Sequence, residues 1–377
     1  MRGSSDAERT RRRDGLQALA DAHGFDGLVV CGRGDEFVRG RIQYAADVYQ
    51  WAGWGYLAVP AKDEGVFLAD PLAGFTHVEP ERPWATDVVV TQEPGRELAS
   101  VLGTSGTVGV VGLEDLAAPA HIAQFRAAAP GLELVDATDA FDDLRAVKSS
   151  EELANLEETS HILRTVFTAL EAELRPGTLI RDVLAEAHRL CRQQGCVDGI
   201  AMFSRPPMTA FTHGIDEPIE RDDVFVIDLE WGGPSGYWLE LRRCYSFGDP
   251  PAAVRRLWEA RLETFDACLT VMRPGASTEE ILVARDRVHA KHGLTAEGSV
   301  LYSAHGIGVD SLEPPWVPGK HRELREGMVL SLHPDARLDE EQRALAGLVS
   351  VGDNVLVTTE GGRRLTYEQE DWVVLER

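Results

Sequence analysis

The sequence lacks a long apolar run, and its cysteines are few. No window approaches the roughly 18 apolar residues of a membrane-spanning helix, and the charged start MRGSSDAERTRRRDG has no apolar segment behind it. The sequence therefore predicts neither a membrane span nor a signal peptide. The five cysteines have no disulfide-framework spacing, and four residues separate Cys191 from Cys196, too many for a CxxC redox or zinc motif. Because reduced thiols are typical of the cytoplasm, we expect a soluble, cytoplasmic protein.

Positive charge is also scarce. The chain has 38 Lys and Arg against 62 Asp and Glu, a net charge of −24, whereas a nucleic-acid partner requires a basic surface. We interpret the acidity as a solubility feature and expect a small-molecule substrate, with no nucleic-acid and no membrane partner. What is present suffices for a buried core, since 44% of the residues are hydrophobic, and 377 residues are typical of two domains.

The first part of the chain alternates between helical and strand patterns. A helix is predicted over about 7–23, and the apolar run GLVVC behind it indicates a buried strand. Further strands are predicted in GWGYLAVPA, EGVFLAD, ATDVVVTQ and TVGVVG, with helices near 95–102 and 117–128. This alternation predicts an α/β layer that ends near Ala146. GRGDEF, after the first strand, lacks the glycine spacing of a dinucleotide-binding motif.

The second part has long helices and strands of another pattern. A helix capped by Ser149 or Ser150 begins at SSEELANLEE, with acidic residues in its first turn. Further helices are predicted over 179–193, 251–272 and 278–291, and strands in VFVIDLEW, GYWLELRRCYSF, GMVLSLH and NVLVTT. These elements predict an α+β domain with a mostly antiparallel sheet and helices on one side.

Five stretches of the chain carry a family resemblance. In order they are LRAVKSSEEL, FTHGIDEPIERDDVFVIDLEWGGPSGYWLELRR, SAHGIGVDSLEPP, REGMVLSLHP and GLVSVGDNVLVTTEGGRRLT. The chain resembles the pita-bread family of creatinase, prolidase, aminopeptidase P and methionine aminopeptidase. The resemblance implies an α+β pita-bread catalytic domain over 147–377, preceded by a smaller α/β creatinase/prolidase-like domain over 1–146. It also implies a homodimer.

The resemblance locates a metal site that is altered in this chain. Metal-dependent members of the family hold two ions with two Asp, one His and two Glu. The matching positions here are Asp228, Glu240 in place of the second Asp, His305, His333 in place of the first Glu, and Gly352 in place of the second Glu. A second family His is replaced by Leu312 and a family Arg by Ser350, whereas the loop His is kept as His213.

These replacements argue against two metal ions. Bridging carboxylates hold two cations together against their mutual repulsion, and Gly352 and His333 together remove two negative charges. Glu240, His305 and His333 remain, a set that suits one zinc, iron or manganese ion. Asp228 is a further candidate ligand or base. A centre with no metal, in which His333 only hydrogen-bonds a neighbour, is the alternative.

Other residues are candidates for catalysis and substrate binding. The resemblance gives His213 a proton-transfer role, and with Asp228, Glu240 and His305 it forms our predicted catalytic set. Glu230 lies two residues from Asp228 on one strand, so both side chains point to the same side. We predict substrate-binding roles for Glu230, Arg242, Glu313 and Trp316. Alternatively, Arg242 pairs with Glu240 or Asp228, Glu313 caps a turn, and Trp316 packs in the core.

The altered site leads to a prediction of changed chemistry. We expect hydrolysis of a C–N bond in a small molecule, as in creatinase, by a non-peptidase with a mononuclear or metal-free site. A lyase and an iron-dependent oxidative enzyme are alternatives on the same scaffold. An X-Pro metallopeptidase and a binding protein without catalysis are the remaining alternatives, and X-Pro peptidase activity is expected to be weak or absent.

Overall fold

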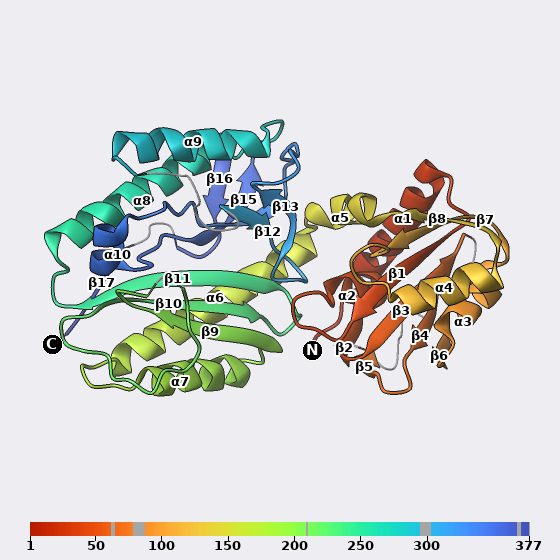
Figure 1. Cartoon of the computed structure of the whole chain (residues 1–377), viewed down its shortest axis with the longest axis horizontal. Coiled ribbons are helices and arrows are strands. Elements are labelled where there is room, and N and C mark those ends of the chain that lie inside the picture. Colours follow the sequence, from red (N-terminus) through yellow and green to blue (C-terminus); the bar gives the residue numbers. More distant parts are fainter. Residues whose placement is uncertain (62–64, 78–86, 209, 295–302, 368–370, 377) are drawn as a thin grey trace. The chain divides into compact units, whose positions relative to one another are not determined.

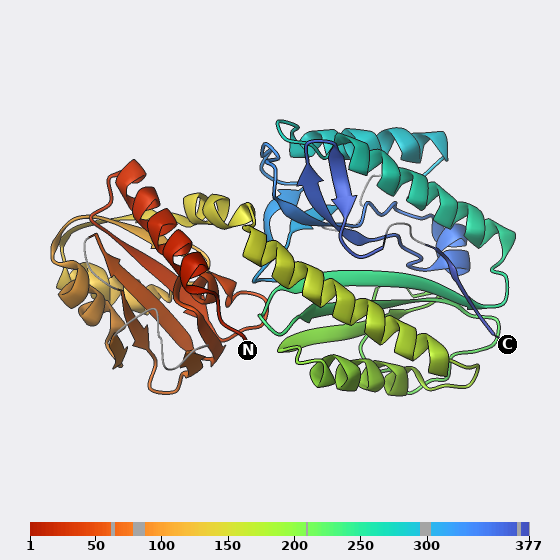
Figure 2. The ribbon, with the colours of Figure 1, turned by 180° about the vertical axis from the view of Figure 1, so that it is seen from behind.

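The computed structural model describes residues 1–61, 65–77, 87–208, 210–294, 303–367 and 371–376. The chain contacts divide it into two compact units, Met1–Arg145 (unit 1) and Ala146–Arg377 (unit 2). Figure 1 labels the elements of each unit, and Figure 2 shows them from behind. No helix in these parts of the chain is both long and apolar enough to cross a membrane.

Unit 1 is built on a mixed six-stranded sheet in the order β6-β4-β3-β1-β7-β8. The apolar run GLVVC lies in β1, whose residues are buried except the last, between an antiparallel β3 and a parallel β7. The strands are β1 (Gly27–Arg33), β3 (Trp54–Pro60), β4 (Val66–Ala69), β6 (Asp87–Val90), β7 (Ser105–Val111) and β8 (Gly131–Asp136), with β2 (Val48–Ala52) and β5 (Gly74–His77) forming a separate pair. The helices are α1 (Asp6–His23), α2 (Gly40–Ala46), α3 (Pro94–Leu102), α4 (Pro119–Ala128) and α5 (Thr138–Ala146).

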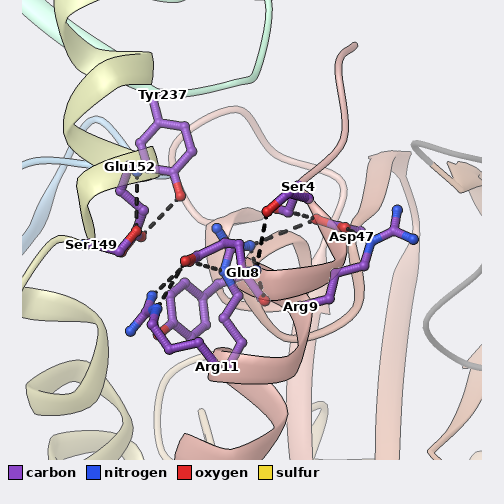
Figure 3. A network of polar contacts seen from close by, with 11 residues as sticks. Ser4, Glu8, Arg9, Arg11, Asp47, Ser149, Glu152 and Tyr237 are labelled. Carbon is purple, nitrogen blue, oxygen red and sulfur yellow. Dashed lines mark hydrogen bonds and ion pairs between the residues drawn. The ribbon is translucent and has the colours of Figure 1, made fainter.

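Polar contacts connect the start of α1 to the end of α2. Ser5 caps α1 by accepting a hydrogen bond from the backbone of Glu8. Asp47, which ends α2 in the left-handed conformation (φ 48°), accepts hydrogen bonds from Ser4 Oγ (3.0 Å) and Arg9 Nε (2.8 Å) (Figure 3). The charged residues of α1 therefore include buried structural pairs.

Unit 2 contains two sheets between two pairs of helices. α6 and α7 pack against β9–β11, whereas α8 packs against β16 and α9 against β13, and β11 meets β15 (Figures 1 and 2). One sheet has the order β17-β11-β10-β9 and the other β13-β12-β14-β15-β16. Their strands are β9 (Asp198–Ser204), β10 (Val224–Gly232), β11 (Trp238–Phe247), β12 (Ala304–Gly306), β13 (Glu313–Val317), β14 (Val329–Leu332), β15 (Asp353–Thr358), β16 (Gly361–Arg364) and β17 (Val373–Leu375). The helices are α6 (Ser150–Glu173), α7 (Ile180–Gln193), α8 (Ala252–Val271), α9 (Thr278–Lys291) and α10 (Glu340–Ala346).

The first helix of unit 2 starts where its sequence predicts. Ser149 is the N-cap, and its side chain and that of Glu152 each bond to the other's backbone, which makes a capping box. Glu152 also accepts a hydrogen bond from Tyr237 Oη (2.9 Å), which ties the start of α6 to the chain that enters β11 (Figure 3).

Candidate metal centre

Four charged side chains share one face of the β10–β11 ladder. In this antiparallel pair Asp228 lies opposite Arg242, and Glu230 lies opposite Glu240. Directly opposed residues point to the same face, as do residues two apart on one strand. Asp228, Glu240 and Arg242 are buried, and Glu230 is half-buried. The sequence spacing and the cross-strand register together thus place three carboxylates beside one guanidinium.

The other sheet supplies two histidines and a serine. His305 on β12 lies opposite Ser331 on β14, and His333 follows β14 two residues after Ser331. The two imidazole rings have centroids 5.3 Å apart, and both histidines are buried. Glu240 Oε2 accepts a hydrogen bond from Ser331 Oγ (2.9 Å) and lies 3.5 Å from His305 Nε2 and 3.9 Å from His333 Nε2. Glu240 is therefore the point where the two sheets meet.

The protonation of these histidines suits metal binding. His305 Nδ1 lies 2.9 Å from the carbonyl oxygen of Gly306, which only accepts, so Nδ1 carries a proton and Nε2 is the ring nitrogen that faces Glu240. Burial lowers the pKa of His333 to about 4, with Arg242 acting in the same direction and Glu240 opposing it, so this ring is neutral at pH 7. His333 Nδ1 has no hydrogen-bond partner among the described residues.

One atom from each of Glu240, His305 and His333 lies within 4.8 Å of the others. A carboxylate oxygen and two imidazole nitrogens this close together attract a positive charge between them. Two nitrogens and one carboxylate form a ligand set that fits a divalent ion such as zinc or iron(II). The residues present therefore fit one metal ion.

Arg242 pairs with both strand carboxylates. Its Nε donates to Asp228 Oδ2 (2.8 Å), and its Nη2 forms an ion pair with Glu240 Oε1. Its Nη1 donates to Ser350 Oγ (3.2 Å) and lies 3.4 Å from Asp335 Oδ2. These contacts favour the pairing alternative for Arg242 over a free guanidinium that binds substrate.

The two carboxylates that share Arg242 have opposite pKa shifts. Burial raises the pKa of both. For Glu240 this effect is outweighed chiefly by the permanent positive charge of Arg242, so its pKa lies well below the usual value. For Asp228 burial prevails, with like charges on Glu240 and Glu230 adding to it, so its pKa lies well above the usual value. Asp228 Oδ1 has no hydrogen-bond partner in the described parts of the chain.

The remaining candidates differ in their surroundings. Glu313 is buried, pairs with Lys148 Nζ (2.8 Å) and accepts from the backbone of Asp310 (3.1 Å), as the turn-capping alternative predicts. Trp316 lies opposite His305 on β13, with ring centroids 6.3 Å apart, so it lines the same region. His213 is exposed and lies outside both ligand clusters found among the described residues. Its catalytic role stays a prediction.

Sequence reasoning missed Asn354 and Asp335. Asn354 on β15 donates from Nδ2 to the carbonyl of Glu240 (2.6 Å), and its Oδ1 lies 3.4 Å from the Glu240 amide nitrogen. It thereby holds the backbone of the central ligand, and Asp335 orients Arg242 through Ser350 (2.7 Å). A signal for Asn354 exists, because asparagine is uncommon within strands such as NVLVTT.

Gly352 lies beside this cluster. A Cβ atom at this position would lie 3.3 Å from Arg242 Cδ and 3.4 Å from His333 Cβ. A methyl group at position 352 would therefore press slightly on the Arg242 side chain.

Family comparisons identify the chain. A model of metallopeptidase family M24 matches residues 154–359, and a creatinase/prolidase N-terminal domain matches 12–147. The chain belongs to metallopeptidase family M24. It is 24% identical to the Xaa-Pro dipeptidase of Pyrococcus furiosus over 324 residues, which cover 85% of this chain and 89% of that protein.

Solved structures agree with this assignment at the level of the fold. The dipeptidase PepE from Mycobacterium ulcerans has a TM-score of 0.82 at 24% identity, with 100% of both chains covered. The prolidase from Pyrococcus horikoshii has a TM-score of 0.77 at 22% identity, covering 96% of this chain and 99% of that one. The predicted fold, a pita-bread catalytic domain preceded by a creatinase-type domain, is confirmed.

The predicted activity is corrected by the same relatives. They carry the names of Xaa-Pro dipeptidases and prolidases, so the prediction of a non-peptidase that hydrolyses a creatinase-like small molecule is wrong. The prediction that the chain is an enzyme is supported, because these relatives are hydrolases, and metal binding in general is supported by the family. The error arose because the loss of Glu at positions 333 and 352 was interpreted as a loss of peptidase chemistry.

Proposed function

We propose that this protein is a metal-dependent dipeptidase that cleaves Xaa-Pro dipeptides and uses one divalent ion held by Glu240, His305 and His333. The observation that carries the proposal is the buried convergence of these three side chains within 4.8 Å. The names of relatives that match nearly the whole chain support the substrate class.

A divalent ion in this position would polarise the peptide carbonyl and activate a water molecule. The chain itself prepares the ligands. Gly306 fixes the tautomer of His305, Ser331 orients the Glu240 carboxylate, and Asn354 holds its backbone. Such outer contacts set ligand orientation and metal affinity.

A carboxylate close to the ligands provides for proton transfer. Glu230 is half-buried, whereas Asp228 and Glu240 are buried. The Oε2 atom of Glu230 accepts a hydrogen bond from Ser311 Oγ (3.0 Å). In this proposal Glu230 takes up the proton of the attacking water. Trp316 forms a wall of the substrate site beside His305.

The test measures proline release from Ala-Pro and Met-Pro, with Ala-Ala and Met-Ala as matched dipeptides, after loading with zinc, manganese or cobalt. We expect cleavage of the Xaa-Pro dipeptides by the loaded protein only. His333→Ala removes one of three ligands and should lower metal content, measured by elemental analysis, together with activity. His292→Ala is the matched control, because His292 is partly exposed and pairs with Glu263 (2.8 Å).

Two results would contradict the proposal in different ways. Metal content unchanged in His333→Ala would remove the proposed ligand set. A protein that binds metal but cleaves no Xaa-Pro dipeptide would leave the ligand set standing and exclude the substrate class.

A further inference from the structure

Three carboxylates converge around the Arg242 side chain. One oxygen from each of Asp228, Glu230 and Glu240, which we term the carboxylate triad, lies within 4.8 Å of the others. Oxygen ligands at this spacing suit hard cations such as Mn²⁺ or Ca²⁺. The triad is distinct from the set of Glu240, His305 and His333, although both include Glu240.

The charge that the triad faces is the Arg242 guanidinium. It contacts Asp228 through Nε at 2.8 Å and Glu240 through Nη2, and the charge of Glu230 also acts on it. The guanidinium is buried among these carboxylates. Because arginine stays protonated at every pH at which proteins fold, this positive charge is permanent.

The backbone also provides space for this side chain. Gly352 lacks a Cβ that would lie 3.3 Å from Arg242 Cδ. At the far end Ser350 and Asp335 bind Nη1 (3.2 and 3.4 Å). Arg242 is therefore held from its methylenes to its tip, with its charge directed at the triad.

We propose that Arg242 is the resident cation of the carboxylate triad: it takes the place of a second metal ion and confines the centre to the one ion at Glu240, His305 and His333. The inference rests on the proposed function for that single ion. The inference assigns Arg242 a positioning role, since the guanidinium would affect metal binding by neutralising the carboxylates that it contacts. It predicts that removal of the guanidinium opens a second, all-oxygen metal site.

The experiment counts metal ions directly. Protein is loaded with one equivalent of Zn²⁺, which prefers the histidine set, and then titrated with Mn²⁺ while the electron paramagnetic resonance signal of free Mn²⁺ is recorded. We expect wild type to leave Mn²⁺ free, and Arg242→Ala and Arg242→Gln to bind about one Mn²⁺ per chain. Arg242→Lys keeps a cation and should behave as wild type.

The neighbouring arginine provides the matched control. Arg243 is next in the chain but on the other face of β11, where it donates to Tyr367 Oη (3.0 Å) and pairs with Glu171 (3.5 Å). Arg243→Ala removes the same charge from the same strand and should leave Mn²⁺ free.

The outcomes separate this inference from the proposed function. Folded Arg242→Ala and Arg242→Gln proteins that bind no added Mn²⁺, or a wild type that binds Mn²⁺ beside zinc, would overturn the inference. Gain of an Mn²⁺ site in the variants would support the inference. If wild type bound no zinc, that result would contradict only the proposed function. If neither variant folds alone, folding restored by Mn²⁺ supports the resident cation, and failure to fold with Mn²⁺ overturns it.

Discussion

The buried histidines of unit 2 differ in the groups that surround them. His305 and His333 converge on the Glu240 carboxylate, whereas His289 on α9 is buried beside the backbone of Pro334 and the charged side chains of Arg285, Asp286 and Arg261. Burial, together with the charges of Arg285 and Arg261, lowers the pKa of His289 from 6.5 to about 4. His289 is therefore neutral at pH 7 in the folded protein, and folding lowers its pKa.

The lowered pKa of His289 predicts that the folded protein is less stable in acid. Between about pH 4 and 6.5 the unfolded chain binds a proton at His289 that the folded chain does not, so stability falls as the pH falls through this window. The unfolding free energy of wild type should fall between about pH 7 and about pH 5. For His289→Gln, which cannot titrate, we expect this fall to be smaller by about 2 kcal/mol. Urea unfolding of metal-free proteins at both pH values measures this difference. Equal pH dependence in the two proteins would refute the assignment.

At the scale of elements, the centre depends on how β11 meets the segment that enters β15. Both segments contribute to the site: β11 carries Glu240 and Arg242, Asn354 lies on β15 in the other sheet, and Gly352 directly precedes β15. Asn354 holds the Glu240 backbone, and Gly352 leaves space for the Arg242 side chain. Residues at 352 and 242 should therefore be coupled energetically.

The coupling can be measured with a double-mutant cycle. Gly352→Glu forces a side chain against Arg242 and His333, and overpacking of this kind costs about 1–3 kcal/mol of unfolding free energy. In an Arg242→Ala background that space is free, so we expect a smaller cost by about 1 kcal/mol or more. Urea unfolding of the four proteins gives the interaction energy. Additive effects would mean that the two side chains do not compete for one space.

At the scale of the whole molecule, the chain matches two-domain relatives from end to end. The family resemblance implies a homodimer, which no contact within a single chain tests. We expect light scattering after size-exclusion chromatography to give twice the chain mass of 41.3 kDa. A single-chain mass at micromolar concentration would refute the dimer.

Much of the architecture was predictable from the sequence. Helices α1, α6, α8 and α9 lie where the sequence predicts them, and the predicted cap located the start of α6, because helix faces and helix ends have local sequence causes. Strands such as β12, with three residues, were missed, since three residues define no period. The expected antiparallel strands of unit 2 divide between two sheets, which alternation of residues does not specify.

The sequence by itself determined the fold, because the order of its motifs along the chain matches a known family, and the same resemblance supplied Glu240, His305 and His333 as predicted ligands. Only the tertiary structure decided what Arg242 does. Its partners Asp228, Ser350 and Asp335 lie 14, 108 and 93 residues away in sequence. Packing of one sheet on the other brings them together, and the gap at Gly352 admits the side chain. Local spacing in the sequence specifies no distance between two sheets, so the contacts of Arg242 become evident only in three dimensions.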